Sequence, residues 1–445
     1  MLFLKTKNNI SFFSLLILFS ILNFVKQNKI VFPFKTQTSK TLSSNYIDLF
    51  IQNKIYTTIE IGTPPKSINI YLTMDTNYLI ISNSSIDPSF YNNKKSNTYF
   101  NISQLNVFYF EYFSNGYYAK DSFLFMTSLE NQEKVKFNNI EFVHAIEFSS
   151  ENYISPGYFG LQIPKKNKLN IYNCLKKENV ISKEFWSLKY TNDNEGYLLL
   201  GEFPPEYNDE NSIQMTNALP CEGESSYLCW NLKFNEIKFG DISVNRDRTA
   251  KIYPEFEFII GTGEYEQKIS ENFFNKLNNK CQKKLSETYY YYFECEKDID
   301  ISIFKNLEFS HSEFMYNFIM TKDDLFKLYN NKLYFLIIFN MYSSYGNYWK
   351  LGKPFIKKYN FGYNIDNNKI LFFNKEEKKE DEEQVDSNLY YYIIIGILAI
   401  CALFMIFFVI IKKFLKPKRK KANELQEEIN IAVDENDKNQ NILGI

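Results

Sequence analysis

The chain has 445 residues, which is too long for one small domain and fits two lobes of roughly 150 residues with appended segments. Its 51 basic and 52 acidic side chains give a net charge of −1, which excludes the basic surface field that attracts nucleic acid. Only His144 and His311 are present, which excludes a histidine-rich metal site, and 45% hydrophobic residues exclude a disordered chain. We expect no metal and no cofactor.

The first apolar segment covers residues 10–25 and follows Lys5 and Lys7. Its length matches the hydrophobic part of a secretory signal peptide and is short for a membrane span. We therefore expect a signal peptide over residues 1–26. An uncleaved anchor is the alternative, because no clean cleavage site of small residues follows the segment.

Residues 51–373 consist of short alternating or apolar runs, separated by clusters of Asn, Gly, Pro and Ser. Alternation with a period of two, rich in Ile, Tyr and Phe, is typical of β-strands. The clearest runs are residues 56–62, 67–74, 196–201 and 368–373. Helical patterns are few and fall at residues 171–179, 271–284 and 322–330. The sequence therefore predicts a mostly β protein.

The cysteines and two sequons of this region fit an exported protein. Five of the 6 cysteines lie there, so two disulfides and one spare thiol are the simplest arrangement. The favoured pairs are the closest in sequence, Cys221–Cys229 and Cys281–Cys295, which leave Cys174 over. The candidate glycosylation sites are Asn83 and Asn101, each with a serine two residues later.

A second apolar segment, residues 393–411, contains no charge and is long enough to cross a membrane as a helix. An acidic stretch precedes it at residues 376–386, and a basic stretch follows at residues 412–421. The positive-inside rule then places the chain's end in the cytosol and residues 27–388 on the luminal or extracellular side. A buried core helix is the alternative, and it does not explain the basic stretch.

These features predict a single-pass type I protein in a secretory-pathway or cell-surface membrane. Its C-terminal parts are an acidic linker at residues 374–388, a transmembrane helix at residues 389–411 and a cytosolic tail at residues 412–445. The bulk of the protein is expected outside the cytosol.

Several motifs follow one another in a characteristic order. The chain reads Thr-Ile-Glu-Ile-Gly-Thr-Pro-Pro at residues 58–65 and Met-Asp-Thr at residues 74–76. Tyr109 comes seven residues before a glycine, and the pairs Phe159-Gly160 and Leu351-Gly352 come later. Together these motifs resemble the pepsin-like aspartic protease family. The resemblance implies a mostly β, bilobal pepsin-like fold, with an N-terminal lobe at residues 50–205 and a C-terminal lobe at residues 206–373.

In that family each lobe contributes one Asp-Thr/Ser-Gly loop, and the two aspartates share one proton. The first loop here reads Asp75-Thr76-Asn77, with asparagine in place of the glycine. The second reads Gly261-Thr262-Gly263, so Gly261 stands at the position of the second aspartate. Since glycine can neither hold nor donate a proton, the resemblance implies that one catalytic carboxylate is lost.

Other residues that support the site in the family are present. Thr76 and Thr262, which link the two loops there, are both kept, and Tyr109 matches the tyrosine of the flap hairpin. Glu264 is a candidate substitute for the missing acid, three residues beyond Gly261. A solvated or salt-bridged glutamate is the alternative interpretation of Glu264.

We therefore expect a membrane-anchored homologue that is catalytically inactive or severely impaired, with an interlobe cleft able to hold an extended peptide or protein ligand. One alternative is an active aspartic-type endopeptidase that uses Asp75 and Glu264. Another is a cell-surface interaction protein whose cleft is vestigial. The expected partners are the membrane and a peptide, without nucleic acid or metal.

Overall fold

A computed structural model describes residues 29–373, with gaps at residues 38–45, 51–53, 84–86, 88, 106–112, 149–154, 165–169, 205–212, 222–223, 246–247, 278 and 342–347. All described residues lie in one unit, Met1–Asn374. The predicted signal peptide, transmembrane helix and cytosolic tail lie outside them. Within the described part of the chain, no helix is long and apolar enough to cross a membrane.

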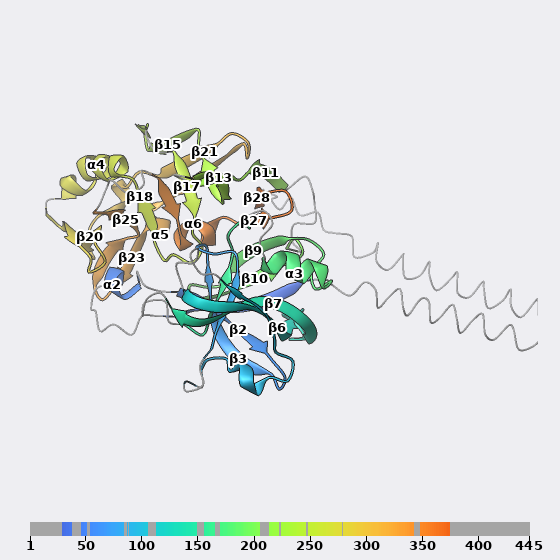
Figure 1. The fold of residues 1–445 in the computed structure, drawn as a ribbon. Coiled ribbons are helices and arrows are strands. Elements are labelled where there is room, and N and C mark those ends of the chain that lie inside the picture. Colours follow the sequence, from blue (N-terminus) through green and yellow to red (C-terminus); the bar gives the residue numbers. More distant parts are fainter. Residues whose placement is uncertain are drawn as a thin grey trace, which may run out of the picture. The chain divides into compact units, whose positions relative to one another are not determined.

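The protein is mostly β and bilobal, as predicted (Figure 1). The largest sheet has 13 strands in the order β11 (Ile213–Asn217), β28 (Lys369–Phe373), β27 (Phe361–Asn364), β9 (Phe185–Tyr190), β10 (Glu195–Leu200), β1 (Ile30–Gln37), β2 (Lys54–Ile61), β3 (Lys66–Thr73), β8 (Gly157–Gly160), β4 (Leu79–Ser82), β7 (Lys134–Phe148), β6 (Phe113–Met126) and β5 (Phe100–Leu105). Strand β2 has the predicted alternation, because every second side chain from Ile55 to Ile61 is buried.

The C-terminal half forms smaller sheets. A 9-stranded sheet contains β14 (Asn231–Lys233), β17 (Thr249–Ile252), β26 (Trp349–Leu351), β18 (Ile259–Gly261), β25 (Ile337–Asn340), β20 (Tyr290–Glu296), β24 (Lys332–Phe335), β23 (Phe326–Tyr329) and β19 (Cys281–Leu285). A 4-stranded sheet contains β16 (Ile242–Val244), β15 (Glu236–Phe239), β21 (Leu307–His311) and β22 (Tyr316–Met320). Strands β12 (Leu219–Cys221) and β13 (Glu224–Cys229) pair with each other.

Helices are short in the described residues. They are α2 (Tyr46–Phe50), α3 (Ile171–Lys177), α4 (Gly263–Asn272), α5 (Lys322–Leu325) and α6 (Lys353–Lys358), with 3-10 turns at Asn93–Lys95, Phe274–Leu277 and Ile301–Ile303. The predicted helix at residues 171–179 is confirmed by α3, whereas the prediction over 271–284 is wrong. There the chain turns into β19, because Cys281 pairs with Cys295 across β20 and a disulfide joins them.

One arrangement of strands occurs twice. In the first half, β8 pairs in parallel with β3 and antiparallel with β4, and β4 pairs in parallel with β7. In the second half, β26 pairs in parallel with β17 and antiparallel with β18, and β18 pairs in parallel with β25. The segment between β3 and β4, residues 74–78, thus corresponds to the segment between β17 and β18, residues 253–258. We call them the Asp75 loop and the Glu255 loop.

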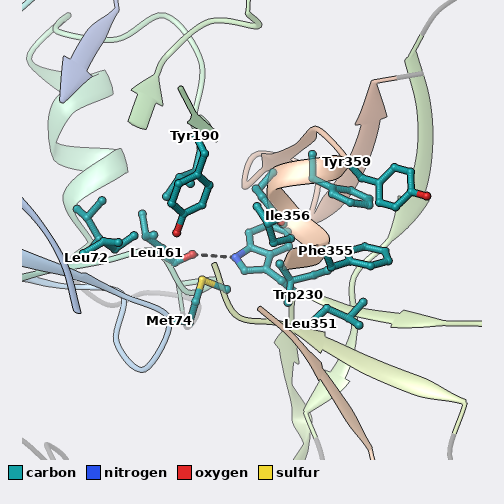
Figure 2. Close-up of a cluster of buried hydrophobic side chains, with 14 of the residues drawn as sticks. Leu72, Met74, Leu161, Tyr190, Trp230, Leu351, Phe355, Ile356 and Tyr359 are labelled. Carbon is teal, nitrogen blue, oxygen red and sulfur yellow. Dashed lines mark hydrogen bonds between the residues drawn. The ribbon is translucent and has the colours of Figure 1, made fainter. Parts of the chain in front are cut away.

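A buried apolar cluster joins the two halves behind these loops. The Trp230 indole Nε1 donates to the backbone oxygen of Leu161 at 2.8 Å. Figure 2 shows Leu161 on one side of the Trp230 ring and Phe355 of α6 on the other, with Met74 of the Asp75 loop beside them. All four side chains belong to one buried core that includes residues of both lobes. Close packing of this core gives the loops a rigid base.

Candidate functional site

The Asp75 loop presents one exposed carboxylate on a fixed backbone. Asp75 is exposed, whereas the other four residues of the loop are buried. The end of β8 lies against the loop: Gly160 N donates to the Tyr78 carbonyl at 2.9 Å, and a β-carbon on Gly160 would lie 2.4 Å from the Thr76 oxygen. Only glycine allows this approach, so the strand end sets the position of Asp75.

The Glu255 loop rests on the end of β26 in the same way. Lys353 N donates to the Phe256 carbonyl at 2.7 Å, and a β-carbon on Gly352 would lie 2.0 Å from the Phe258 oxygen. Gly352 therefore serves the Glu255 loop as Gly160 serves the Asp75 loop. The strand pairing and both glycines assign residues 253–258 as the counterpart of the Asp75 loop.

This assignment corrects the expectation for Gly261. The family resemblance implied the second catalytic position there, but Gly261 is the last residue of β18 and pairs with Phe339 of β25. A β-carbon at Gly261 would come within 2.7 Å of the Phe339 ring and 2.9 Å of Ile337. A side chain at this position would thus enter the core of the second lobe.

The two residues after Gly261 begin a helix. Thr262 is the N-cap of α4, where its buried hydroxyl accepts from Tyr265 N at 3.4 Å, and Gly263 is the first helical residue. The hydroxyl of Thr76, its expected partner across the loops, is also buried and accepts from Tyr78 N at 3.3 Å. Both threonine hydroxyls thus support their own segments.

Glu264 has contacts of its own on α4. Its carboxylate accepts from Asn245 N at 3.1 Å and lies 3.5 Å from the ammonium group of Lys268, one helical turn away. This matches the salt-bridged arrangement that was the alternative interpretation of Glu264. Neither of these contacts involves Asp75.

Contacts across the two loops come from other residues. The Tyr253 hydroxyl donates to Asp75 Oδ1 at 2.9 Å, and Lys251 Nζ donates to the Tyr253 oxygen at 2.9 Å. On the backbone side, Met74 N donates to Glu255 Oε1 at 2.7 Å. Tyrosine and glutamate of the Glu255 loop thus contact Asp75 and the residue before it.

The carboxyl group of Glu255 is partly buried. The residue as a whole is half-buried, but its Oε2 is buried and has no hydrogen-bond partner in the described part of the chain. Burial and, second, the negative charge of Asp75 raise the pKa of the Glu255 carboxyl to about 8. At neutral pH and below, Glu255 is therefore mostly protonated. The site combines an exposed carboxylate with a buried neutral acid.

The rest of the Glu255 loop is also held in place. The Pro254 carbonyl accepts from the Tyr190 hydroxyl at 2.7 Å. The Glu257 carboxylate accepts from Lys353 Nζ at 2.7 and 3.0 Å, and these two side chains are 11% and 8% exposed. Burial raises the pKa of Glu257, and the Lys353 charge opposes this. Such a buried ion pair fixes geometry more than it adds stability.

The structure also places the remaining predicted residues. Both predicted disulfides, Cys221–Cys229 and Cys281–Cys295, are present, and Cys174 is a buried free thiol. Asn101 is exposed on β5, and Asn83 is half-buried after β4. Tyr109 of the expected flap lies outside the described residues. No group of His, Cys, Asp and Glu side chains in the described ranges is arranged to hold a metal ion.

Comparisons with known proteins agree with this architecture. A model of the family described as eukaryotic aspartyl protease matches residues 54–374. Comparison with curated proteins gives no match. Among solved structures, conglutin gamma, a basic 7S globulin from lupine seeds, is 12% identical with a TM-score of 0.56. The match covers 78% of this chain and 95% of conglutin gamma. At this identity the similarity concerns the fold alone.

Proposed function

Because the chain belongs to the eukaryotic aspartyl protease family, we propose that it is a pepsin-like protein whose peptide hydrolysis is absent or severely impaired. The supporting observation is that the two acids where the loops meet, Asp75 and Glu255, differ in their exposure to solvent. Asp75 is exposed, whereas Glu255 Oε2 is buried. The protein would use the junction for binding and not for cleavage.

The difference in exposure between Asp75 and Glu255 lowers the expected rate of peptide hydrolysis. Hydrolysis by paired acids needs one carboxylate to take a proton from water while the other acid polarises the scissile carbonyl. Both groups must reach the same substrate atoms. A buried carboxyl of Glu255 cannot donate to a bound peptide, and loss of one positioned acid lowers rates by about 10²- to 10⁴-fold.

Tyr253 does not supply the missing acid in this arrangement. Burial and then the charge of Asp75 raise the pKa of the Tyr253 hydroxyl, so it stays protonated at every physiological pH. Its proton is directed at Asp75 Oδ1. The hydroxyl therefore occupies one oxygen of the carboxylate that would have to activate water.

Two features support peptide binding. Asp75 is exposed on a fixed loop and can accept hydrogen bonds from a ligand. Strand β5 is the last strand of the large sheet, and its residues Phe100–Gln104 are exposed, so its outer edge can accept an added strand. The proposal also includes the membrane anchor at residues 389–411 and a secretory-pathway or cell-surface location, which rest on the sequence.

A cleavage assay tests this proposal. The full-length protein, purified in detergent, would be incubated with a mixed peptide library between pH 3 and pH 7, beside Asp75→Asn. We expect the same background in both. Cleavage that disappears in Asp75→Asn would contradict the proposal.

One observation favours a second candidate function, an active aspartic endopeptidase. The charge of Asp75 acts on Glu255, so the two acids interact as a catalytic pair would. In that case Glu255→Gln would abolish cleavage, whereas Glu264→Gln, a matched change of an acid that contacts Lys268, would leave it intact.

A further inference from the structure

We propose that Glu255 is a neutral carboxyl that holds the Asp75 loop against the Glu255 loop. Ionisation of this carboxyl would weaken the contact between the two loops. This inference goes beyond the proposed function, because it holds whether or not the protein cleaves peptides. Glu255 is a positioning residue here, since it acts on the Asp75 loop through the backbone of Met74.

The geometry of the clamp is a single cross-lobe contact. The hydrogen bond from Met74 N to Glu255 Oε1, 2.7 Å long, joins residues 181 positions apart in the chain. The second oxygen, Oε2, is buried and without a hydrogen-bond partner in the described residues. A buried, unpaired oxygen is far more costly on an ionised carboxylate than on a neutral carboxyl. The site therefore suits the protonated form.

The charged and titratable groups around Glu255 come from five parts of the fold. Asp75 lies on the first loop, and its negative charge disfavours a second one. Lys251 of β17 is the positive group that favours ionisation. Tyr253 of the same loop, Tyr190 of β9 and Tyr363 of β27 have hydroxyls whose pKa is raised by burial and further by Glu255 or its acidic neighbours.

These influences do not cancel. Burial and Asp75 outweigh Lys251 and the Met74 amide, so the pKa of Glu255 rises from 4.5 to about 8. A carboxyl with a raised pKa in the folded state binds its proton more tightly than the unfolded chain does. Its stabilising contribution is complete below pH 4.5 and is lost as the pH rises towards 8. The junction is thus strongest in acid.

The experiment measures thermal unfolding of the full-length protein in detergent at each pH from 4.5 to 9. The variants are Glu255→Gln, which keeps the acceptor for Met74 N but cannot ionise, and the control Glu264→Gln. We expect the Tm of wild type and control to fall between pH 5 and pH 8, and that of Glu255→Gln to fall clearly less. Glu257, whose pKa is also raised, is common to all three and does not contribute to the difference.

Equal pH dependence in wild type and Glu255→Gln would overturn the proposal. A second variant covers the case in which Glu255→Gln does not fold. Asp75→Asn removes the charge that raises the pKa of Glu255 while keeping the side chain's size, so the fall in Tm should move to lower pH. An unmoved midpoint would also refute the inference. Peptide cleavage by the wild type would refute the proposed function alone and leave this result unaffected.

Discussion

The Asp75 loop and the Glu255 loop have the same frame and different contents. Each lies between two strands that flank a third, and each rests on a glycine at the end of that third strand, Gly160 or Gly352. The first loop exposes an aspartate among buried residues, whereas the second holds two half-buried glutamates, Glu255 and Glu257. The comparison teaches that backbone pairing can repeat a loop while its side chains change the chemistry.

The difference is electrostatic as well. Asp75 faces solvent, whereas burial raises the pKa values of both Glu255 and Glu257. Glu257 is compensated by Lys353, and Glu255 retains an unpaired oxygen in the described structure. The Asp75 loop therefore exposes its carboxylate to solvent, whereas the Glu255 loop keeps a carboxyl oxygen buried.

The largest expected effect comes from substitutions that test whether both loops require a glycine at the end of the neighbouring strand. Gly160→Ala would place a β-carbon 2.4 Å from a backbone oxygen of the Asp75 loop, and Gly352→Ala would place one 2.0 Å from a backbone oxygen of the Glu255 loop. We expect losses of about 4 kcal/mol or more in unfolding free energy, or no folded protein. Chemical denaturation measures this.

Gly263→Ala is the matched control for these variants. A β-carbon there would meet nothing within 4 Å, at the start of α4. This change should be neutral or stabilise by less than about 1 kcal/mol. If Gly352→Ala were as stable as Gly263→Ala, the proposed equivalence of the two loops would fail.

The next effect distinguishes the Glu255 loop from Gly261 as the counterpart of Asp75. In Gly261→Asp, a carboxylate would enter the core beside Phe339 and Ile337. We expect about 3 kcal/mol of destabilisation and no peptidase activity, because burial of an unpaired charge is costly. Denaturation and a peptide assay check both parts. Cleavage that appears in Gly261→Asp and depends on Asp75 would restore the sequence-based assignment.

The smallest effect concerns the direct contact between the loops. Tyr253→Phe removes the hydroxyl that donates to Asp75 Oδ1 at 2.9 Å, and we expect a loss of about 1 kcal/mol in unfolding free energy. Tyr316→Phe is a suitable control, since its half-buried ring packs on Phe318 at a centroid distance of 5.0 Å. Equal stability of the two variants would show that the contact contributes nothing.

Much of the fold was predictable because it rests on local patterns. The alternation in β2, the close cysteine pairs and the glycines at positions 160 and 352 all left clear signals in the sequence. The helix predicted over residues 271–284 was wrong, since α4 ends at Asn272, a 3-10 turn follows, and pairing of β19 with β20 overrode the helical pattern. Long-range pairing of this kind has no local signal.

The candidate site was predictable only in part. Asp75 was identified by its Asp-Thr motif. Tyr253 and Glu255 were missed because Gly261-Thr262-Gly263 resembles the Asp-Thr/Ser-Gly motif of the family more closely than residues 253–258 do. One signal was available: an alternating run, Thr249–Ile252, and a short apolar run, Ile259–Gly261, enclose the Glu255 loop as β3 and β4 enclose Asp75. Reading it requires knowledge of which strands pair.

The sequence alone thus determined the class of fold, the disulfide pairs and the identity of one acid, because periodicity, spacing and short motifs are properties of neighbouring residues. The tertiary structure alone decided which second acid meets the first and in which protonation state. Strand pairing brings Glu255 to Met74 from 181 residues away, and burial beside Asp75 then raises its pKa. Desolvation and charge proximity depend on neighbours in space, and no local pattern encodes them.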